Sequence, residues 1–211
     1  MDVFVTILEM IGIVSFAASG ALTAMKKHMD LFGVIVLGLV PSIGGGIVRD
    51  LILGNTPPLA FSNPAYTIVA VTTSIIIFIP WVRHHLMHKE RLFEYSLFFM
   101  DSLGLGVFTV MGIWNALEFL PESGSFLLVF VGVMTGVGGG MIRDVLAGDM
   151  PYILVKHIYA CASIVGAVCC VLLRKIIPLY LAMLIGCILV LTVRLLAAHY
   201  HWNLPKADDI E

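Results

Sequence analysis

The sequence predicts an all-α integral membrane protein with seven transmembrane helices. Hydrophobic residues make up 60% of the 211 positions and charged residues only 12%, whereas a soluble domain is about 25% charged. The apolar residues gather in segments of about 20, the length that crosses the hydrocarbon core of a bilayer. Two segments carry the same glycine-rich motif. We therefore expect an inverted 3+3 repeat followed by one extra helix.

Seven apolar segments have the length of a membrane span. They cover residues 3–24, 30–53, 63–83, 95–117, 124–147, 152–173 and 178–199. Because the loops between them are short, we expect one transmembrane domain over residues 1–202. Its parts are repeat one (1–90), repeat two (91–175) and the seventh helix (178–199), and a polar cytoplasmic tail follows at 203–211.

The basic residues predict which way the chain crosses the membrane. No basic residue precedes the first apolar segment, which is the reverse of a secretory signal peptide. An odd number of spans places the termini on opposite sides. Apart from the two motif arginines, eight basic residues then lie on one side and two on the other: Lys26, Lys27, Arg83, Lys89, Arg91, Lys156, Arg194 and Lys206 against Arg174 and Lys175. The positive-inside rule predicts a cytoplasmic C-terminus and an outside N-terminus.

Several kinds of protein are not expected from the composition and motifs. The net charge of −2 gives no reason to expect nucleic-acid binding. The sequence lacks GxSxG and HExxH, and "GGGIVRD" lacks the GK[ST] ending of a P-loop. His84, His85 and His88 resemble a metal cluster only by composition, because they lie in a charged loop. We expect no enzyme, no cofactor and no metal site.

Two copies of one motif establish the repeat. "SIGGGIVRD" covers 42–50 and "GVGGGMIRD" covers 136–144, so that Gly138 corresponds to Gly44 at an offset of 94 residues (138 − 44). Upstream, "FAASG" at 16–20 resembles "FTVMG" at 108–112 at an offset of 92 (108 − 16). Consecutive units of three spans enter the membrane from opposite faces, and such inverted repeats place a pathway near their pseudo-two-fold axis.

The triple glycines are the first candidates for lining this pathway. The set is Gly44, Gly45, Gly46, Gly138, Gly139 and Gly140, with the small hydroxyl residues Ser19, Ser42 and Thr135 nearby. Glycine weakens a helix by about 1 kcal/mol relative to alanine, so we expect the backbone to unwind there and free carbonyl groups for a cation. The alternative is close packing, because small residues let helices approach. The two interpretations are compatible.

Each motif also carries an arginine and an aspartate within an apolar segment. Arg49 and Arg143 follow the glycines by about one helical turn, Arg49 toward the outer face and Arg143 toward the inner face. A charge at the bilayer centre costs about 2.5–3.5 kcal/mol on insertion scales. Adjacent helical positions point in different directions, so we expect Asp50 and Asp144 not to pair with the arginines beside them.

The expected partners are Glu9 and Asp101, which correspond at an offset of 92 residues (101 − 9). Glu9 falls at the depth of Arg49 and Asp101 at the depth of Arg143, which predicts Glu9–Arg49 and Asp101–Arg143 pairs. The alternative is that each charge snorkels to its own interface. Lys156 near the cytoplasmic surface is a candidate for gating or lipid contact, with snorkelling as its alternative.

These motifs together resemble the prokaryotic TRIC (trimeric intracellular cation) channels, a group that overlaps with bacterial membrane proteins carrying a glycine-transporter domain. The stretches that carry the resemblance are "FAASGAL" (16–22), "DLFGVIVLG" (30–38), "GGGIVRDLILG" (44–54), "DSLGLGVF" (101–108), "GVGGGMIRDVLAG" (136–148) and "RLLA" (194–197). They span nearly the whole chain. One departure is Pro41, where the second repeat has Thr135; a proline at this place is expected to sharpen a kink.

The resemblance implies a homotrimer in the plasma (inner) membrane, with a pore in each subunit and contacts to membrane lipid. The second and fifth spans would line the pore, and potassium or another monovalent cation would pass through it. The glycine-transporter domain implies instead a secondary carrier of glycine or another small amino acid, in which Glu9 or Asp101 would hold the ammonium group. A membrane scaffold without transport activity is the third alternative, and it leaves the buried charges without a purpose.

Overall fold

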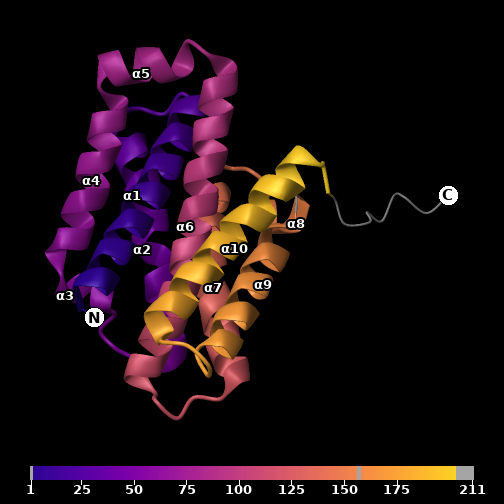
Figure 1. The fold of residues 1–211 in the computed structure, drawn as a ribbon. Coiled ribbons are helices and arrows are strands. Elements are labelled where there is room, and N and C mark those ends of the chain that lie inside the picture. Colours follow the sequence, from indigo (N-terminus) through magenta and orange to yellow (C-terminus); the bar gives the residue numbers. More distant parts are fainter. Residues whose placement is uncertain (1, 156–157, 203–211) are drawn as a thin grey trace.

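A computed structural model describes residues 2–155 and 158–202 of the chain (Figure 1). Across these residues the secondary structure is entirely helical. The helices are α1 (Asp2–Lys26), α2 (Leu31–Leu53), α3 (Leu59–Ser62), α4 (Pro64–Phe78), α5 (Pro80–Met87), α6 (Glu90–Phe119), α7 (Ser125–Leu146), α8 (Tyr152–Val155), α9 (Tyr159–Leu173) and α10 (Leu179–His199).

Five of these helices are long and apolar enough to cross a membrane: α1, α2, α6, α7 and α10. A sixth candidate is the pair of α4 and α5, which meet at a bend of 68°. The bend follows from Pro80, which starts α5 and has no backbone N–H to continue the hydrogen bonds of α4. The apolar helix α9 is shorter, with 15 residues. The predicted third and sixth spans are therefore each divided between two helices.

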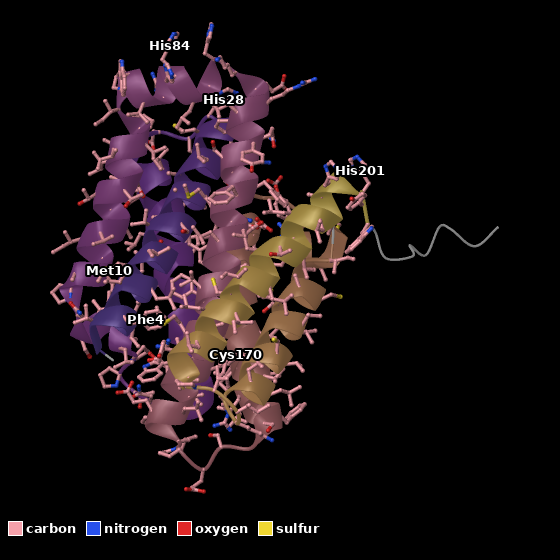
Figure 2. All side chains as sticks on the ribbon, viewed as in Figure 1. Phe4, Met10, His28, His84, Cys170 and His201 are labelled. Carbon is pink, nitrogen blue, oxygen red and sulfur yellow. The ribbon has the colours of Figure 1, made fainter. Side chains whose placement is uncertain are left out.

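The surface of the bundle is that of a membrane protein. Large apolar side chains are exposed on it, including Phe32 (75% exposed), Phe126 (83%) and Ile176 (82%). Figure 2 places His28 and His84 near the end of the molecule where α5 lies, and Phe4 toward the opposite end. Because soluble monomers rarely expose large contiguous apolar patches, this surface matches the apolar helices in indicating a lipid environment.

The core is formed where the long helices of the two halves meet. Helices α1 and α2 pack against each other, α1 packs on α6, and α2 packs on α7, while α9 and α10 cover α6 and α7. α5 lies across one end of this bundle (Figure 1), which we call the α5 end. At that end Lys26 on α1 contacts Glu94 on α6, and Lys27 contacts Asp149 after α7, each at 2.5 Å.

The expectation that the triple glycines unwind is wrong. α2 is continuous through Gly44–Gly46, and α7 is continuous through Gly138–Gly140. The middle glycine of each triplet packs on the other helix. A Cβ atom at Gly45 would collide with the carbonyl oxygen of Thr135, and one at Gly139 would lie 2.5 Å from the carbonyl oxygen of Pro41. The glycines thus bring two backbones into contact, and this packing compensates their weak helix propensity.

Candidate functional site

Two clusters of buried charges flank the α2–α7 contact. The first lies near the end of α2. Arg49 and Asp50 are 4% and 1% exposed, and Arg49 Nε donates to Asp50 Oδ1 at 2.8 Å. The other carboxylate oxygen, Asp50 Oδ2, accepts a hydrogen bond from the backbone N–H of Leu59 at 2.8 Å. Gly54, with φ of 75°, adopts the left-handed conformation that reverses the chain after α2.

The second cluster repeats this arrangement near the end of α7. Arg143 Nε and Nη2 donate to Asp144 Oδ1 at 2.9 and 2.7 Å. Asp144 Oδ2 accepts from the backbone N–H of Tyr152 at 2.8 Å. Gly148 follows with φ of 71°. Each aspartate therefore bonds both its own arginine and the chain that returns after the helix.

The prediction that these aspartates do not pair with the adjacent arginines is wrong. The Cβ atoms of adjacent helical residues do diverge, but an arginine carries its Nε and Nη atoms at the end of a long flexible chain. Arg49 and Arg143 fold back along the helix surface, so that their guanidinium groups reach Asp50 and Asp144. Such a charge-assisted contact is among the stronger hydrogen bonds in proteins.

The predicted Asp101–Arg143 pair is confirmed. Arg143 Nη1 donates to Asp101 Oδ1 at 2.6 Å, and the two residues are 1% and 0% exposed. The same Nη1 donates to Ser19 Oγ on α1. Arg143 thus joins α7 to α6 and α1 through one guanidinium group. An arginine buried with two carboxylates is the form in which a membrane protein tolerates such a charge.

The second cluster contains a further arginine to which the sequence motifs assign no role. Arg194 on α10 is 1% exposed; its Nη2 lies 3.3 Å from Asp101 Oδ2 and its Nε donates to Ser102 Oγ at 3.3 Å. The Tyr159 hydroxyl donates to Asp101 at 3.3 Å. The signal was present, because an arginine inside an apolar span indicates a functional site. Arg194 was counted only as a charge near the cytoplasmic face.

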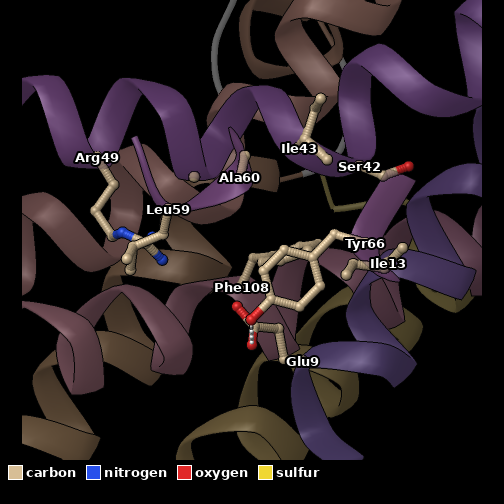
Figure 3. Close-up of a pocket in the computed structure, with 10 residues that line it drawn as sticks. Glu9, Ile13, Ser42, Ile43, Arg49, Leu59, Ala60, Tyr66 and Phe108 are labelled. Atoms are coloured by element: carbon tan, nitrogen blue, oxygen red, sulfur yellow. Dashed lines mark hydrogen bonds between the residues drawn. The ribbon is translucent and has the colours of Figure 1, made fainter. Parts of the chain in front are cut away.

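The predicted Glu9–Arg49 pair is wrong. Glu9 Oε2 accepts a hydrogen bond from the Tyr66 hydroxyl at 2.6 Å, and within the described part of the chain Glu9 forms no ion pair, because the nearest guanidinium is engaged by Asp50. Glu9 and Arg49 instead line one small cavity with Tyr66 (Figure 3). The cavity has about 20 Å³ of space for the centres of water molecules, enough for about one or two waters.

The remaining predicted residues are placed as follows. Ser42 and Gly46 line this cavity, and Ser42 Oγ donates to the carbonyl oxygen of Gly38 on its own helix. Thr135 Oγ1 donates to the carbonyl oxygen of Val131 at 2.6 Å. Lys156 lies outside the described residues. Among the described residues, no three His, Cys, Asp or Glu side chains gather at a geometry that suits a metal ion.

A bundle of apolar helices that encloses buried ion pairs is typical of a membrane protein with several transmembrane helices. A family model described as "Glycine transporter" matches residues 6–81 and 98–175, and the chain belongs to this family, the TRIC family. It is 40% identical over 200 residues to the UPF0126 inner membrane protein YadS of Escherichia coli K12, covering 94% of this chain and 93% of that protein. It is 37% identical over 202 residues to a UPF0126 membrane protein of Deinococcus radiodurans, covering 94% and 89% of the two chains.

Solved structures are similar over nearly the full length. A chain from a study of conductance through TRIC cation channels shares 36% identity with a TM-score of 0.82, covering 98% of both chains. The TRIC trimeric intracellular cation channel orthologue from Rhodobacter sphaeroides shares 32% identity with a TM-score of 0.81, covering 94% of this chain and 98% of that one. The resemblance inferred from the motifs is thereby confirmed.

Proposed function

We propose that this protein is a monovalent-cation channel, selective for potassium over anions, with a pore in each subunit of a homotrimer. The observation that carries the proposal is the similarity to solved TRIC cation channels at 36% identity over 98% of both chains. The pathway in each subunit passes beside the α2–α7 contact, between the two charge clusters. Its candidate lining residues are those of the triple glycines, with Ser19, Ser42 and Thr135.

The proposed topology has seven crossings arranged as an inverted 3+3 repeat plus α10, with α4–α5 as the third crossing and α8–α9 as the sixth. Contacts related by the sequence offsets support it. Gly45 meets the carbonyl group of Thr135 and Gly139 meets that of Pro41, which are equivalent contacts at an offset of 94 (135 − 41). Phe16 stacks on Phe108 at 5.2 Å between ring centroids, and these residues correspond at an offset of 92. A residue that contacts its own equivalent lies near a pseudo-two-fold axis.

The α5 end is proposed to face the cytoplasm of a plasma (inner) membrane. Lys26 and Lys27 lie at that end, and the loop that joins α5 to α6 adds Lys89, while Arg174 and Lys175 lie between α9 and α10 at the other end. The positive-inside rule then places the N-terminus outside. The proposed division of the chain is repeats at 1–90 and 91–175, the seventh helix at 178–199, and a cytoplasmic tail at 203–211, which lies outside the described residues.

Arginines beside a cation pathway would repel the ion unless their charge were balanced. In the second cluster, which the proposed orientation makes the inner cluster, Arg143 contacts both Asp101 and Asp144. In the first cluster, which becomes the outer cluster, Arg49 contacts Asp50. These ion pairs support cation conduction, because they cancel the repulsion. They weaken the case for a glycine carrier, because all three nitrogen atoms of Arg143 are already bonded to this chain.

Recording from purified protein in planar bilayers tests the proposal. With a tenfold potassium chloride gradient, unitary currents should reverse near the potassium equilibrium value, about 59 mV for a monovalent ion. Chloride-selective currents would contradict potassium selectivity. A silent bilayer together with saturable uptake of labelled glycine into liposomes would replace the channel by the carrier. Mass measurement of the detergent-solubilised protein tests the trimer.

A further inference from the structure

The outer cavity has the properties of a cation-binding site. We propose that Glu9 and Tyr66 bind a monovalent cation there, on the outer side of the channel. The inference rests on the proposed function and deepens it, since it assigns the ion a binding residue. Glu9 lies in the first three turns of α1, at the end of the bundle opposite to α5 (Figure 1).

The two clusters differ in formal charge although their residues correspond. In the inner cluster the acids Asp101 and Asp144 are balanced by the arginines Arg143 and Arg194. In the outer cluster two acids, Glu9 and Asp50, face the single arginine Arg49. The inner cluster is therefore neutral, and the outer cluster carries an excess of one negative charge.

The excess charge belongs to Glu9. The guanidinium of Arg49 is turned to Asp50, with Nε at 2.8 Å from its Oδ1. Glu9 instead accepts a hydrogen bond from the hydroxyl of Tyr66, a neutral donor that leaves the charge in place. Figure 3 shows the hydrogen bond between the carboxylate of Glu9 and the hydroxyl of Tyr66, with Arg49 to the left of this pair. Glu9 is therefore a partly buried carboxylate outside any ion pair; an uncompensated charge of this kind is costly, and a bound cation would compensate it.

The chemistry of the cavity favours a monovalent ion. Oxygen atoms are the ligands that hard cations prefer, and Glu9 and Tyr66 supply a carboxylate and a hydroxyl oxygen. Glu9 and Arg49 are the charged residues among the described residues that line the cavity. Because Asp50 already pairs with Arg49, one monovalent cation completes the charge balance of the three residues. Space for one or two waters suits an ion that keeps part of its hydration shell.

The test compares two substitutions that remove the same charge at the same end of the molecule. Glu9→Gln keeps an oxygen that accepts from Tyr66 and removes the charge. Glu122→Gln is the matched control, because Glu122 lies in the turn between α6 and α7 at the same end of the bundle, is exposed and does not line the cavity. Glu9→Asp retains the charge. Melting temperature and elution volume establish that each variant folds.

The readout is the potassium concentration at half-maximal unitary conductance. Glu9→Gln should raise it about fivefold, which corresponds to about 1 kcal/mol for unit charges about 4 Å apart in water. Glu122→Gln should leave it near the wild-type value, and Glu9→Asp should stay closer to wild type than Glu9→Gln does. Equal values for Glu9→Gln and Glu122→Gln would overturn the inference while leaving the channel function intact.

A second measurement does not depend on conduction. Thallium(I), a potassium substitute that scatters strongly, should give an anomalous peak beside Glu9 in crystals of the wild type and none in crystals of Glu9→Gln. A wild-type crystal without this peak would overturn the inference. If bilayers are silent but the peak is present, the proposed channel function fails and the cation site stands.

Discussion

The contact between the two glycine triplets makes a prediction about single methyl groups. Gly138 and Gly139 are adjacent in α7, yet they face different surroundings. A Cβ atom at Gly139 would lie 2.5 Å from the carbonyl oxygen of Pro41 and 2.8 Å from the ring of Phe16. A Cβ atom at Gly138 would meet only the Cα atom of Gly45, at 3.4 Å, which is ordinary van der Waals contact.

Alanine substitutions at Gly138 and Gly139 should have opposite effects on stability, because a gain in helix propensity competes with the cost of overpacking. Replacing glycine by alanine inside a helix adds about 1 kcal/mol of helix propensity. Overpacking a close contact costs about 1–3 kcal/mol, and Gly139→Ala lies at the upper end because a backbone oxygen cannot rotate away. Gly138→Ala should therefore be neutral or stabilising by up to about 1 kcal/mol. Gly139→Ala should be destabilising by about 1–2 kcal/mol, the difference between the two effects.

The assay is reversible unfolding of the purified protein in mixed detergent micelles, with the free energy of unfolding compared between the two variants. Gly46→Ala is a second control in α2, because its Cβ atom would lie 3.8 Å from the nearest Nη atom of Arg49. The reasoning is refuted if Gly139→Ala is as stable as Gly138→Ala. An equal loss of unfolding free energy in both variants would also refute it, because it would mean that the glycines matter for backbone flexibility and not for the contact between α2 and α7.

Three other substitutions test the charge assignments. Asp101→Asn leaves Arg143 and Arg194 without the carboxylate that they share. The free energy of unfolding should fall by about 3–5 kcal/mol, as it does when one partner of a buried ion pair is removed. A loss under about 1 kcal/mol would contradict the assignment of a buried charge cluster. Arg194→Met should destabilise the protein less than Asp101→Asn does in the same assay, because Arg143 still bonds Asp101 at 2.6 Å. A greater loss of stability for Arg194→Met would show that Asp101 is not the central residue of the cluster. Lys27→Ala breaks a partly exposed pair with Asp149 and should change the free energy of unfolding by less than about 1 kcal/mol; a greater change would show that the pair is not a surface contact.

Hydropathy alone predicted where the helices lie. The span expected at 30–53 is the helix Leu31–Leu53, and the span expected at 124–147 is the helix Ser125–Leu146. Long apolar segments leave few alternatives, because a backbone in lipid must satisfy its hydrogen bonds within one helix. The bend at Pro80 was not predicted, although proline carries the physical reason for it.

The partners of the charged residues were predicted less well. Asp101 and Arg143 were matched by depth in the membrane, and depth was sufficient because both lie in straight spans of opposite direction. The same argument failed for Glu9 and Arg49, because depth says nothing about the direction of a long side chain. Arg49 had a nearer carboxylate on its own helix.

The structure of the glycine triplets could not be predicted from helix propensity alone. Helix propensity is a local quantity, and it correctly marks Gly44–Gly46 and Gly138–Gly140 as weak points of isolated helices. Whether a weak point unwinds depends on what packs against it. That information belongs to the other half of the chain, 94 residues away (138 − 44), and no local pattern contains it.

The position of Arg194 has a consequence for how the protein is made. Of the described helices, α10 is the last to leave the ribosome, and Arg194 is carried by it. Until α10 inserts, Asp101 and Asp144 outnumber Arg143, so the nascent bundle holds one uncompensated charge in the membrane. The inner cluster becomes electrically neutral only when this final helix docks and brings Arg194 to Asp101, so the order of synthesis makes that docking the last step in balancing its charges.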